Sequence, residues 1–504
     1  MQIEEMISKN RAECCGCEAC ANICPKNAIT MIRDAEGFAY PKINPELCIQ
    51  CGRCDATCPA LNFEKKFPDE LPKVFVATYP DEKILRHSSA GGVFSALSEI
   101  ILREGGVVFG AGFDKKWRVV HSAARTLDDL ESLRRSKYVQ SQIGDVYRQV
   151  RDALKSGSVL FSGTPCQCAG LKHFLGEEPD NLLTVDLICH GAPSPAVWEY
   201  YIGTIDEDHE VAYVNFRNKR NGWLNYRFEI NFKDRGYRST SLGGDIYGKL
   251  FLHDVTLRPS CSACKFKFPN GRSDLTLGDA WGIKDYAPEM SDNRGTSLII
   301  VHTPKGKNFF EQLNLIKKQV KFHAAIRRNP VFMRPCVADT RRENFFADFY
   351  KSDNKLGVMH KYFLEDNTEI RKENGVKNGR MYNETYRAVV AHIRKQFKKN
   401  ILVITPPLDD NALKALESHF EQNFSDCGVY LLKFKDKGLL NCTETFSSVA
   451  FDLKDEVAAL NNLVKQYNIT EICAEEPPQF DSSVVTEWLK TCGLPVRTFS
   501  SNAE

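Results

Sequence analysis

The chain of 504 residues is long enough for roughly three or four domains with buried cores of their own. Its composition, 42% hydrophobic and 26% charged, is that of ordinary globular proteins, and a formal net charge of +2 gives no general attraction to nucleic acid or membranes. It has no apolar stretch of about 18 residues and no apolar segment near its first residues. We therefore expect no membrane span, no signal peptide and a cytoplasmic location.

The spacing C-x2-C-x2-C-x3-C-P occurs twice before residue 60. The two runs contain Cys14, Cys17, Cys20 and Cys24, then Cys48, Cys51, Cys54 and Cys58. This spacing is typical of ferredoxins with two [4Fe–4S] clusters, in which the last cysteine of each run binds the cluster of the other run. The runs therefore predict one cluster on Cys14, Cys17, Cys20 and Cys58, and another on Cys48, Cys51, Cys54 and Cys24.

Structural zinc and a disulfide framework are the alternative interpretations of these cysteines. Zinc sites use paired CxxC units, which match two triple runs poorly, and disulfides belong to secreted chains. Cys15 is an additional thiol in the first run, which we interpret as a packing residue rather than a ligand. Residues 1–64 are therefore predicted to form a dicluster ferredoxin domain, which handles electrons one at a time.

After a charged, proline-containing segment, residues 74–79 predict a strand, and apolar residues at helical spacing predict a helix from residue 93. Ser88, Ser89, Gly91 and Gly92 precede this helix. A start rich in serine and glycine leaves backbone N–H groups free and lets a phosphate approach closely. An ordinary helix cap with a tight turn is the alternative interpretation.

Residues 158–176 and 181–195 each show a buried strand followed by a turn of small residues. Strands alternating with helices predict α/β layering, in which ligands bind at the carboxyl ends of the strands. Cys166 and Cys189 fall at such ends. Antiparallel strands are then predicted between about 205 and 260, followed by the CxxC pair Cys261 and Cys264. That pair suits zinc, a redox pair or a cluster.

Towards the end of the chain, residues 305–320 predict a basic amphipathic helix, and the polar residues 366–380 predict a linker. Residues 381–504 again alternate strands and helices, as a Rossmann-like domain does, but contain no glycine fingerprint. For this last domain, a docking module and a degenerate sugar-nucleotide enzyme are alternative interpretations.

Five motifs together resemble the coenzyme F420 hydrogenase/dehydrogenase beta subunits. They are HSSAGGVFSAL (87–97), RSKYVQS (135–141), SGTPCQCAGLK (162–172), DLICHGAPSP (186–195) and CSACKF with SDLTLGDAWG (261–282). Bacterial relatives of that family similarly carry a dicluster ferredoxin in front. The resemblance covers about residues 1–350 in order and spacing.

The resemblance implies an iron–sulfur flavoprotein that binds FAD. The residues it assigns to the flavin are Ser88, Ser89, Gly91, Gly92, Ser95, Lys137, Tyr138, Gly163 and Thr164. It also implies a third [4Fe–4S] cluster on Cys166, Cys189, Cys261 and Cys264, with Cys168 as a substitute for Cys166. Buried thiols or zinc are the alternatives for this third set.

We therefore predict a multidomain fold, α+β and α/β. It has a ferredoxin domain (1–64), an α/β flavin domain with an antiparallel β insertion (65–365), a linker (366–380) and a Rossmann-like domain (381–504). The predicted function is an oxidoreductase that passes electrons between clusters, FAD and a two-electron substrate, which is F420-like or another organic molecule. The expected partner is a ferredoxin or another redox protein. His190 and Asp279 are the candidate general acids. The alternative is an electron-transfer subunit without a substrate site.

Overall fold

The computed structural model describes residues 2–208, 210–234, 236–271, 273–364 and 389, together with six strands nearer the C-terminus. The chain divides into two compact units. The first contains residues 1–66 and 72–385, and the second contains 67–71 and 386–504. Among the described residues, no helix is long and apolar enough to cross a membrane.

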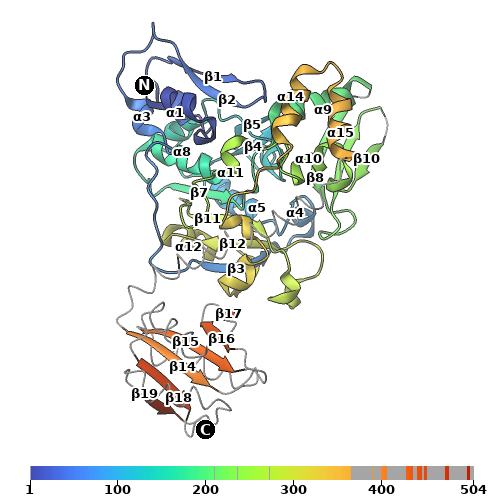
Figure 1. Ribbon diagram of the computed structural model, residues 1–504. Helices are drawn as coiled ribbons and strands as arrows, with labels where there is room; N and C mark the ends of the chain where they lie inside the picture. Colours follow the sequence, from blue (N-terminus) through green and yellow to red (C-terminus); the bar gives the residue numbers. More distant parts are fainter. Residues whose placement is uncertain are drawn as a thin grey trace. The chain divides into compact units, whose positions relative to one another are not determined.

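The ferredoxin segment is a set of short helices beside a β-hairpin (Figure 1). Its elements are α1 (Gln2–Lys9), η1 (Arg11–Glu13), α2 (Ala19–Ile23), β1 (Ile29–Arg33), β2 (Ala39–Ile43) and α3 (Arg53–Thr57). The Asp55 carboxylate accepts hydrogen bonds from the backbone N–H groups of Gln2 (3.2 Å) and Ile3 (3.0 Å). This contact fixes the start of α1 against α3, because the first N–H groups of a helix have no partner within the helix.

The centre of the first unit is a mixed sheet of eight strands. In sheet order they are β13 (Ile316–Val320), β3 (Lys73–Thr78), β12 (Ser297–Val301), β11 (Leu275–Asp279), β7 (Leu182–Leu187), β6 (Val159–Gly163), β4 (Val107–Phe113) and β5 (Val119–Ala124). Strands β4, β6, β7 and β11 are parallel to one another, and the remaining pairs are antiparallel. The predicted α/β layering is thus present around this sheet.

Further helices of the first unit lie between and after these strands. They are α4 (Glu82–Arg86), α5 (Val93–Arg103), α6 (Leu130–Leu133), α7 (Val146–Ala153), α8 (Pro165–Leu175), α9 (Pro195–Asp208), α10 (Ile246–Leu252), α11 (Pro259–Ser262), α12 (Pro304–Glu311), α13 (Phe322–Ile326), α14 (Arg342–Lys351) and α15 (Lys355–Leu364). Short 3₁₀ turns are η2 (Leu242–Gly244), η3 (Ile283–Asp285), η4 (Pro288–Met290) and η5 (Pro330–Phe332). Helix α5 packs on β4 and β6, and α8 packs on β6 and β7.

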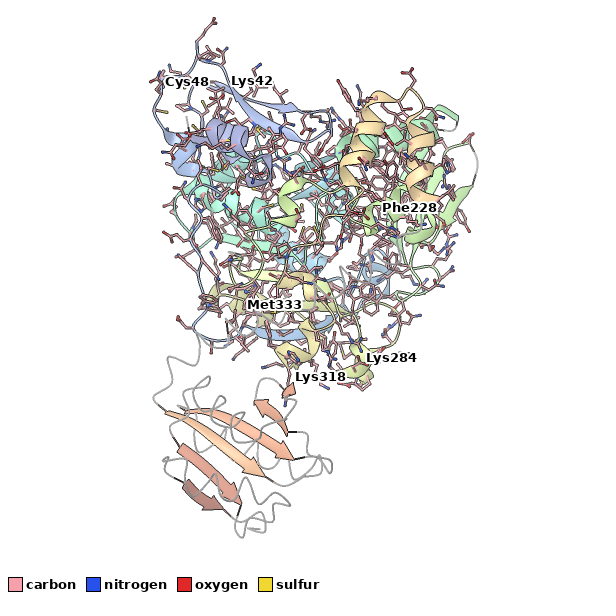
Figure 2. All side chains as sticks on the ribbon, in the orientation of Figure 1. Lys42, Cys48, Phe228, Lys284, Lys318 and Met333 are labelled. Atoms are coloured by element: carbon pink, nitrogen blue, oxygen red, sulfur yellow. The ribbon has the colours of Figure 1, made fainter. Side chains whose placement is uncertain are left out.

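The predicted antiparallel insertion is a three-stranded sheet. It contains β8 (Val211–Asn218), β9 (Arg227–Phe232) and β10 (Tyr237–Thr240), in the order β10-β9-β8. Its inner face is aromatic: Phe216 stacks on Phe228 with ring centroids 4.8 Å apart, and Trp198 of α9 lies 5.1 Å from Phe216. Figure 2 labels Phe228 on this insertion. Burial of these large rings attaches the insertion firmly to α9.

The predicted helix over 305–320 is only half correct. Helix α12 ends at Glu311, and residues Ile316–Val320 instead form strand β13, which pairs antiparallel with β3. Pairing with the free edge of the central sheet overrides the helical pattern of this segment, because tertiary contacts outweigh a local propensity.

Polar contacts dock the ferredoxin segment on the central domain. Glu18 accepts hydrogen bonds from the backbone N–H groups of Ile143 and Gly144, both at 3.0 Å. Arg33 forms a two-pronged ion pair with Glu199 of α9, at 2.7 and 2.8 Å. The two regions therefore form one body, in agreement with their grouping in the first compact unit.

The second unit contains a six-stranded sheet in the order β17-β16-β15-β14-β18-β19. The strands are β14 (Lys399–Thr405), β15 (Cys427–Phe434), β16 (Leu440–Glu444), β17 (Ser448–Ala450), β18 (Glu471–Glu475) and β19 (Val496–Phe499). Strands β15, β14, β18 and β19 are parallel, as expected for an α/β domain. The predicted linker 366–380 and the helices expected between these strands lie outside the described residues, so the Rossmann-like assignment stays a prediction.

Candidate redox centre

The cysteines of the ferredoxin segment line two small cavities. The inner cysteine cavity is lined by Cys14, Cys17, Cys20 and Cys58, together with Cys15. The outer cysteine cavity is lined by Cys24, Cys48, Cys51 and Cys54. Each cavity thus contains three cysteines of one run and the last cysteine of the other run. These are the two sets that the sequence spacing predicts for a pair of [4Fe–4S] clusters.

The backbone turns in the same way at equivalent positions of the two runs. Gly16 and Gln50 have φ of +69° and +51°, and Glu18 and Gly52 have φ of +63° and +70°. These left-handed residues flank the second cysteine of each run and curve the chain around its cavity. Backbone N–H groups point at the sulfurs, as between Ala28 N and Cys24 Sγ (3.2 Å). Such N–H contacts suit thiolate ligands, since they stabilise negative charge on sulfur.

The inner and outer cysteine cavities differ in their surroundings. On the inner side, Cys17 is 8% exposed, and a Cβ added at Gly170 of α8 would lie 3.0 Å from its sulfur. On the outer side, Cys51 is exposed and Ile49 is 58% exposed. The inner cavity therefore lies against the central domain, whereas the outer cavity lies nearer the surface.

Four cysteines around each cavity match the ligand set of a four-iron cluster. Within the ranges that the structure describes, no three His, Cys, Asp or Glu side chains converge closely enough to hold a single metal ion. The described cysteines form no disulfide. A four-iron cluster spans a wider gap than one zinc ion and accepts all four thiolates of each cavity.

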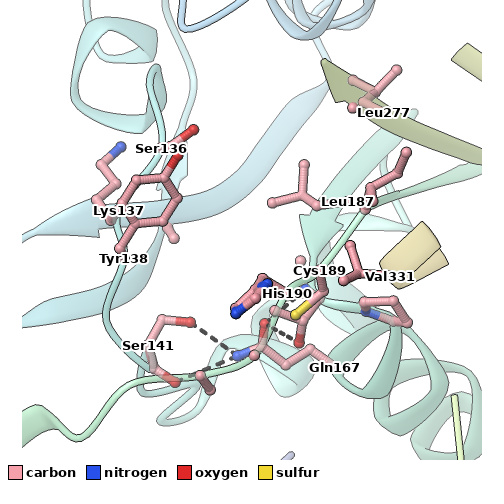
Figure 3. Close-up of a pocket in the computed structure, with 18 of the residues that line it drawn as sticks. Ser136, Lys137, Tyr138, Ser141, Gln167, Leu187, Cys189, His190, Leu277 and Val331 are labelled. Carbon is pink, nitrogen blue, oxygen red and sulfur yellow. Dashed lines mark hydrogen bonds between the residues drawn. The ribbon is translucent and has the colours of Figure 1, made fainter. Parts of the chain in front are cut away.

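A cavity of about 500 Å³ lies at the carboxyl ends of β6, β7 and β11, next to the start of α5. We call it the large pocket. Its lining includes the following predicted site residues: Ser88, Ser89, Gly92, Ser95, Lys137, Tyr138, Gly163, Thr164, Cys166, Cys189, His190, Cys261, Cys264 and Asp279. Figure 3 shows Lys137 and Tyr138 on one side of this pocket and Cys189 and His190 on another. Its volume is within the usual range for ligand sites.

Gly91 is the predicted flavin residue that does not line the large pocket. A Cβ added to Gly91 would lie 2.2 Å from the carbonyl oxygen of Ala77, and the Gly91 N–H donates to Ser297 Oγ (2.9 Å). Gly91 therefore allows close contact with the sheet. Gly92 has φ of +81° and directly precedes α5, whose start has no side-chain cap. The free N–H groups of α5 suit a phosphate at this position.

The polar side chains near α5 are held in place by one another. Ser89 Oγ accepts a hydrogen bond from the Ser136 N–H (2.9 Å), and Ser95 Oγ accepts one from Arg134 Nε (3.0 Å). The Lys137 ammonium donates to the carbonyl oxygens of Ser132 (3.1 Å) and Arg134 (2.6 Å). Burial, assisted by the charge of Arg135, lowers the pKa of Lys137 to about 7. An anion in the pocket would favour the charged form of this amine.

Two buried nitrogens in the lining have no hydrogen-bond partner among the described residues: His121 Nδ1 and Arg217 Nε. Burial lowers the pKa of His121 to about 4, so its ring is neutral near pH 7. Buried polar atoms without a partner are rare and point to a missing one. A polar ligand in the large pocket would supply it, so these residues fit a bound flavin.

The third cysteine set is gathered at one end of the large pocket. Cys166 lies in the first turn of α8, Cys189 follows β7, and Cys261 and Cys264 belong to α11 and the loop after it. Burial raises the pKa of Cys189 to about 12. A thiolate there needs a compensating cation, which an iron cluster provides. Cys168 does not line the pocket, and its thiol instead contacts the Val185 carbonyl oxygen (3.8 Å), so a substitute role for it is disfavoured.

The two candidate acids have different surroundings. His190 Nε2 lies 2.5 Å from Asp254 Oδ1, which orients the ring at the pocket wall. Asp279 accepts hydrogen bonds from both terminal nitrogens of Arg217 and from the Trp223 indole N–H (2.9 Å). The Asp279 oxygens are thus occupied by protein donors, which favours a positioning role for this carboxylate.

Three residues of this region were not predicted from the sequence: His121, Arg217 and Arg258. Their side chains reach the large pocket from β5, β8 and connecting loops, and none belongs to a spacing motif. Arg258 lies shortly before Cys261 and Cys264, and this closeness could have indicated it. His121 and Arg217 lie in none of the motifs, so the sequence gives no signal for them.

Two curated proteins are similar over short stretches. An uncharacterized polyferredoxin-like protein of Methanocaldococcus jannaschii is 42% identical over 57 residues, covering 10% of this chain and 34% of its own. The ketoisovalerate oxidoreductase subunit VorC of Methanothermobacter marburgensis is 38% identical over 55 residues, covering 10% and 70%. The match thus spans about a third of the polyferredoxin-like protein and 70% of the VorC subunit.

A xenon-derivatized F420-reducing [NiFe] hydrogenase complex of Methanosarcina barkeri is similar at a TM-score of 0.36 and 17% identity, covering 64% of this chain and 94% of that chain. A score this low does not establish a common fold. Family models give the more specific result. The 4Fe-4S dicluster domain matches residues 13–62, and the C-terminal part of the coenzyme F420 hydrogenase/dehydrogenase beta subunit matches residues 157–325. The chain therefore contains the C-terminal region of the coenzyme F420 hydrogenase/dehydrogenase beta-subunit family and carries a 4Fe–4S dicluster domain ahead of that region.

Proposed function

We propose that the chain is an iron–sulfur flavoprotein oxidoreductase. It holds two [4Fe–4S] clusters in the cysteine cavities, and a third cluster and FAD in the large pocket. When bound, the clusters supply single-electron transfer and the flavin supplies two-electron chemistry, which together connect a one-electron carrier to a two-electron substrate. The observation that carries the proposal is the place of Cys15, which lines both the inner cysteine cavity and the large pocket. The inner cysteine cavity and the large pocket are therefore direct neighbours.

The residues of the large pocket divide into those for the cluster and those for the flavin. Cys166, Cys189, Cys261 and Cys264 are the proposed cluster ligands. Ser88, Ser89, Gly92 and the start of α5 are proposed to hold the flavin phosphates, with Lys137 as the positive charge. Arg217, fixed by Asp279, lies over the rings of Tyr226 (4.3 Å) and Trp281 (5.1 Å). This rigid cationic wall is suited to orient a ring system and exclude water.

The substrate side is assigned to His190. Asp254 fixes the orientation of the His190 ring, and an oriented imidazole at the pocket wall suits a general acid. The substrate is proposed to be a two-electron carrier of the F420 type or another organic molecule. The pocket volume of about 500 Å³ supports an enzyme with its own site.

An electron-transfer subunit that delivers electrons to a partner enzyme is the second candidate. The similarity to VorC, which by its name is an oxidoreductase subunit, favours it. The two candidates differ in one property: only the enzyme reduces a small two-electron acceptor as a purified single chain. Turnover of deazaflavin or another organic acceptor by the isolated chain would therefore favour the enzyme.

The composition of the purified protein tests the proposal. Iron, sulfide, zinc and extracted flavin are measured on protein kept under anaerobic conditions. About twelve irons and one FAD per chain are expected, the sum for three four-iron clusters and one flavin. About eight irons without flavin would contradict the proposed flavin site and the third cluster. That result would favour the electron-transfer subunit over the enzyme. Zinc in place of iron would contradict the proposal.

A further inference from the structure

Arg258 lies between the inner cysteine cavity and the large pocket. Its side chain is 2% exposed, it lines the large pocket, and it directly precedes helix α11 with Cys261. A Cβ added at Gly16, in the loop of the first cysteine run, would lie 2.6 Å from Arg258 Nη1. The guanidinium thus fills the space against the cluster loop and closes the wall between the two sites.

Each donor of Arg258 has a definite acceptor. Nε donates to the Cys14 carbonyl oxygen (2.9 Å), and Nη1 donates to Gln140 Oε1 (3.1 Å). Nη2 donates to the Ala39 carbonyl oxygen (3.0 Å) and approaches Cys14 Sγ (3.7 Å). The guanidinium also lies over the Tyr40 ring, 4.3 Å from its centroid. Among these contacts, the Cys14 sulfur is the group that becomes negatively charged on binding iron.

No carboxylate pairs with Arg258 in the part of the chain that the structure describes. The buried Arg217 and Arg342, in contrast, pair with Asp279 and Glu36. Glu18 lies within electrostatic range of Arg258, but its carboxylate accepts the backbone N–H groups of Ile143 and Gly144 instead. A buried cation without a countercharge is costly, so an anion is expected beside it. Four thiolates around an iron cluster supply that negative charge.

We propose that Arg258 raises the reduction potential of the cluster in the inner cysteine cavity above that of the outer one. The inference rests on the proposed function. A thiolate-bound cluster becomes more negative when reduced, and a nearby buried cation stabilises the reduced form. Lys26 and Arg53 beside the outer cysteine cavity are exposed, so water and salt screen their charges.

The difference in potential favours transfer of one electron from the outer cluster to the inner cluster. One electron leaves the cluster held by Cys24, Cys48, Cys51 and Cys54, which is oxidised, and enters the inner cluster, which is reduced. No bond forms or breaks, and no proton moves. A low-potential one-electron carrier then re-reduces the outer cluster. Arg258 thus gives the transfer a direction, from the surface towards the large pocket.

Anaerobic redox titration followed by electron paramagnetic resonance tests this role in Arg258→Gln and Arg258→Lys. Arg258→Gln is expected to make reduction of the inner cluster about tenfold less favourable, a shift of ~59 mV to lower potential. The outer cluster should not move. Arg258→Lys keeps the charge and should keep most of the wild-type potential. Titration in a Cys51→Ser, Cys261→Ser background, which lacks the outer cluster and the proposed third cluster, assigns the inner signal.

A second variant tests the role of Arg258 even if Arg258→Gln does not fold. Gln140→Glu places a carboxylate beside Nη1 and should lower the inner potential while Arg258 stays in place. The matched control is Arg33→Gln, which breaks the ion pair with Glu199 and weakens docking of the ferredoxin segment without touching a cysteine. It should leave both potentials unchanged.

Iron content distinguishes failure of the proposed function from failure of the role of Arg258. A wild-type chain without the ferredoxin clusters would contradict the proposed function itself. Full iron in Arg258→Gln and Gln140→Glu with unmoved potentials would overturn only the role of Arg258. An equal shift in Arg33→Gln would also overturn it, because docking rather than charge would then set the potential.

Discussion

The cysteine cavities and the large pocket are built in opposite ways. Each cysteine cavity takes its lining from within residues 3–60, whereas the large pocket collects residues from 12 to 331. In the cavities, left-handed positions such as Gly16 and Gly52 shape the loops locally. In the pocket, the meeting of parallel strand ends brings distant segments together. A substitution in a cysteine run should therefore affect one cluster, whereas the pocket depends on the whole sheet.

The largest expected effect is the loss of one cluster. Cys51→Ser replaces an exposed ligand of the outer cysteine cavity, so iron should fall by about four atoms per chain while flavin stays bound. Iron and flavin analysis of the anaerobic variant measures both quantities. The matched control is Cys15→Ser, which changes a thiol of the other run that is not an assigned ligand and should keep all iron. Equal iron contents in the two variants would contradict the assignment of Cys51 as a ligand of the outer cluster.

A smaller effect, on FAD affinity, is expected from a substitution at the start of α5. Gly92→Ala forces a side chain into a left-handed conformation, at a cost of about 1–2 kcal/mol, and places its Cβ 2.9 Å from Tyr79 Cβ. FAD affinity should fall at least ~10-fold because the phosphate site is displaced. Gly105→Ala is the control, since Gly105 has φ of +76° and no atom within 4 Å of the added Cβ. Equal FAD affinity in both variants would remove the phosphate from this helix start.

The next effect is a pH dependence of flavin binding. Burial lowers the pKa of Lys137 to about 7, so its ammonium is protonated below this pH and loses its charge above it. An anionic phosphate binds the charged form better, so FAD affinity should fall as the pH rises through about 7, by up to ~10-fold per pH unit. Lys137→Arg keeps its charge and should lose this dependence. Fluorescence titration of flavin-free protein measures it, and identical profiles for both proteins would contradict the assignment.

The smallest effect is expected from the second compact unit. A chain that ends at Thr385 lacks residues 386–504 and retains every residue that lines the two cysteine cavities and the large pocket. Its iron and flavin contents should equal those of the full chain. Loss of flavin on this truncation would show that the pocket depends on the second unit.

The same contrast explains what the sequence could predict. The spacing of the two runs names the cysteines that share each cavity, because every ligand is close in sequence. The α/β layering and the antiparallel insertion also followed from strand patterns. The left-handed conformations of Glu18 and Gln50 could not be read from residue type, because both residues rarely adopt them.

The pocket was less predictable. The residue patterns marked its cysteines and the helix start at Ser88–Gly92, but a family resemblance supplied their common role. The assigned residues line one pocket, except Gly91 and the substitute ligand Cys168. Arg217 and Arg258 were not foreseen, since their importance comes from burial and from partners far away in the sequence. The edge strand β13 was also missed, because its pairing with β3 is a long-range contact.

The most direct test of the account is anaerobic rapid mixing with a reduced one-electron ferredoxin, following flavin absorbance. The wild-type chain and Cys51→Ser, each with its flavin bound, are compared at the same donor concentration. The account predicts that flavin reduction is fast in the wild-type chain and strongly slowed in Cys51→Ser, because electrons enter through the outer cysteine cavity. Flavin reduction at the same rate in both proteins would contradict it.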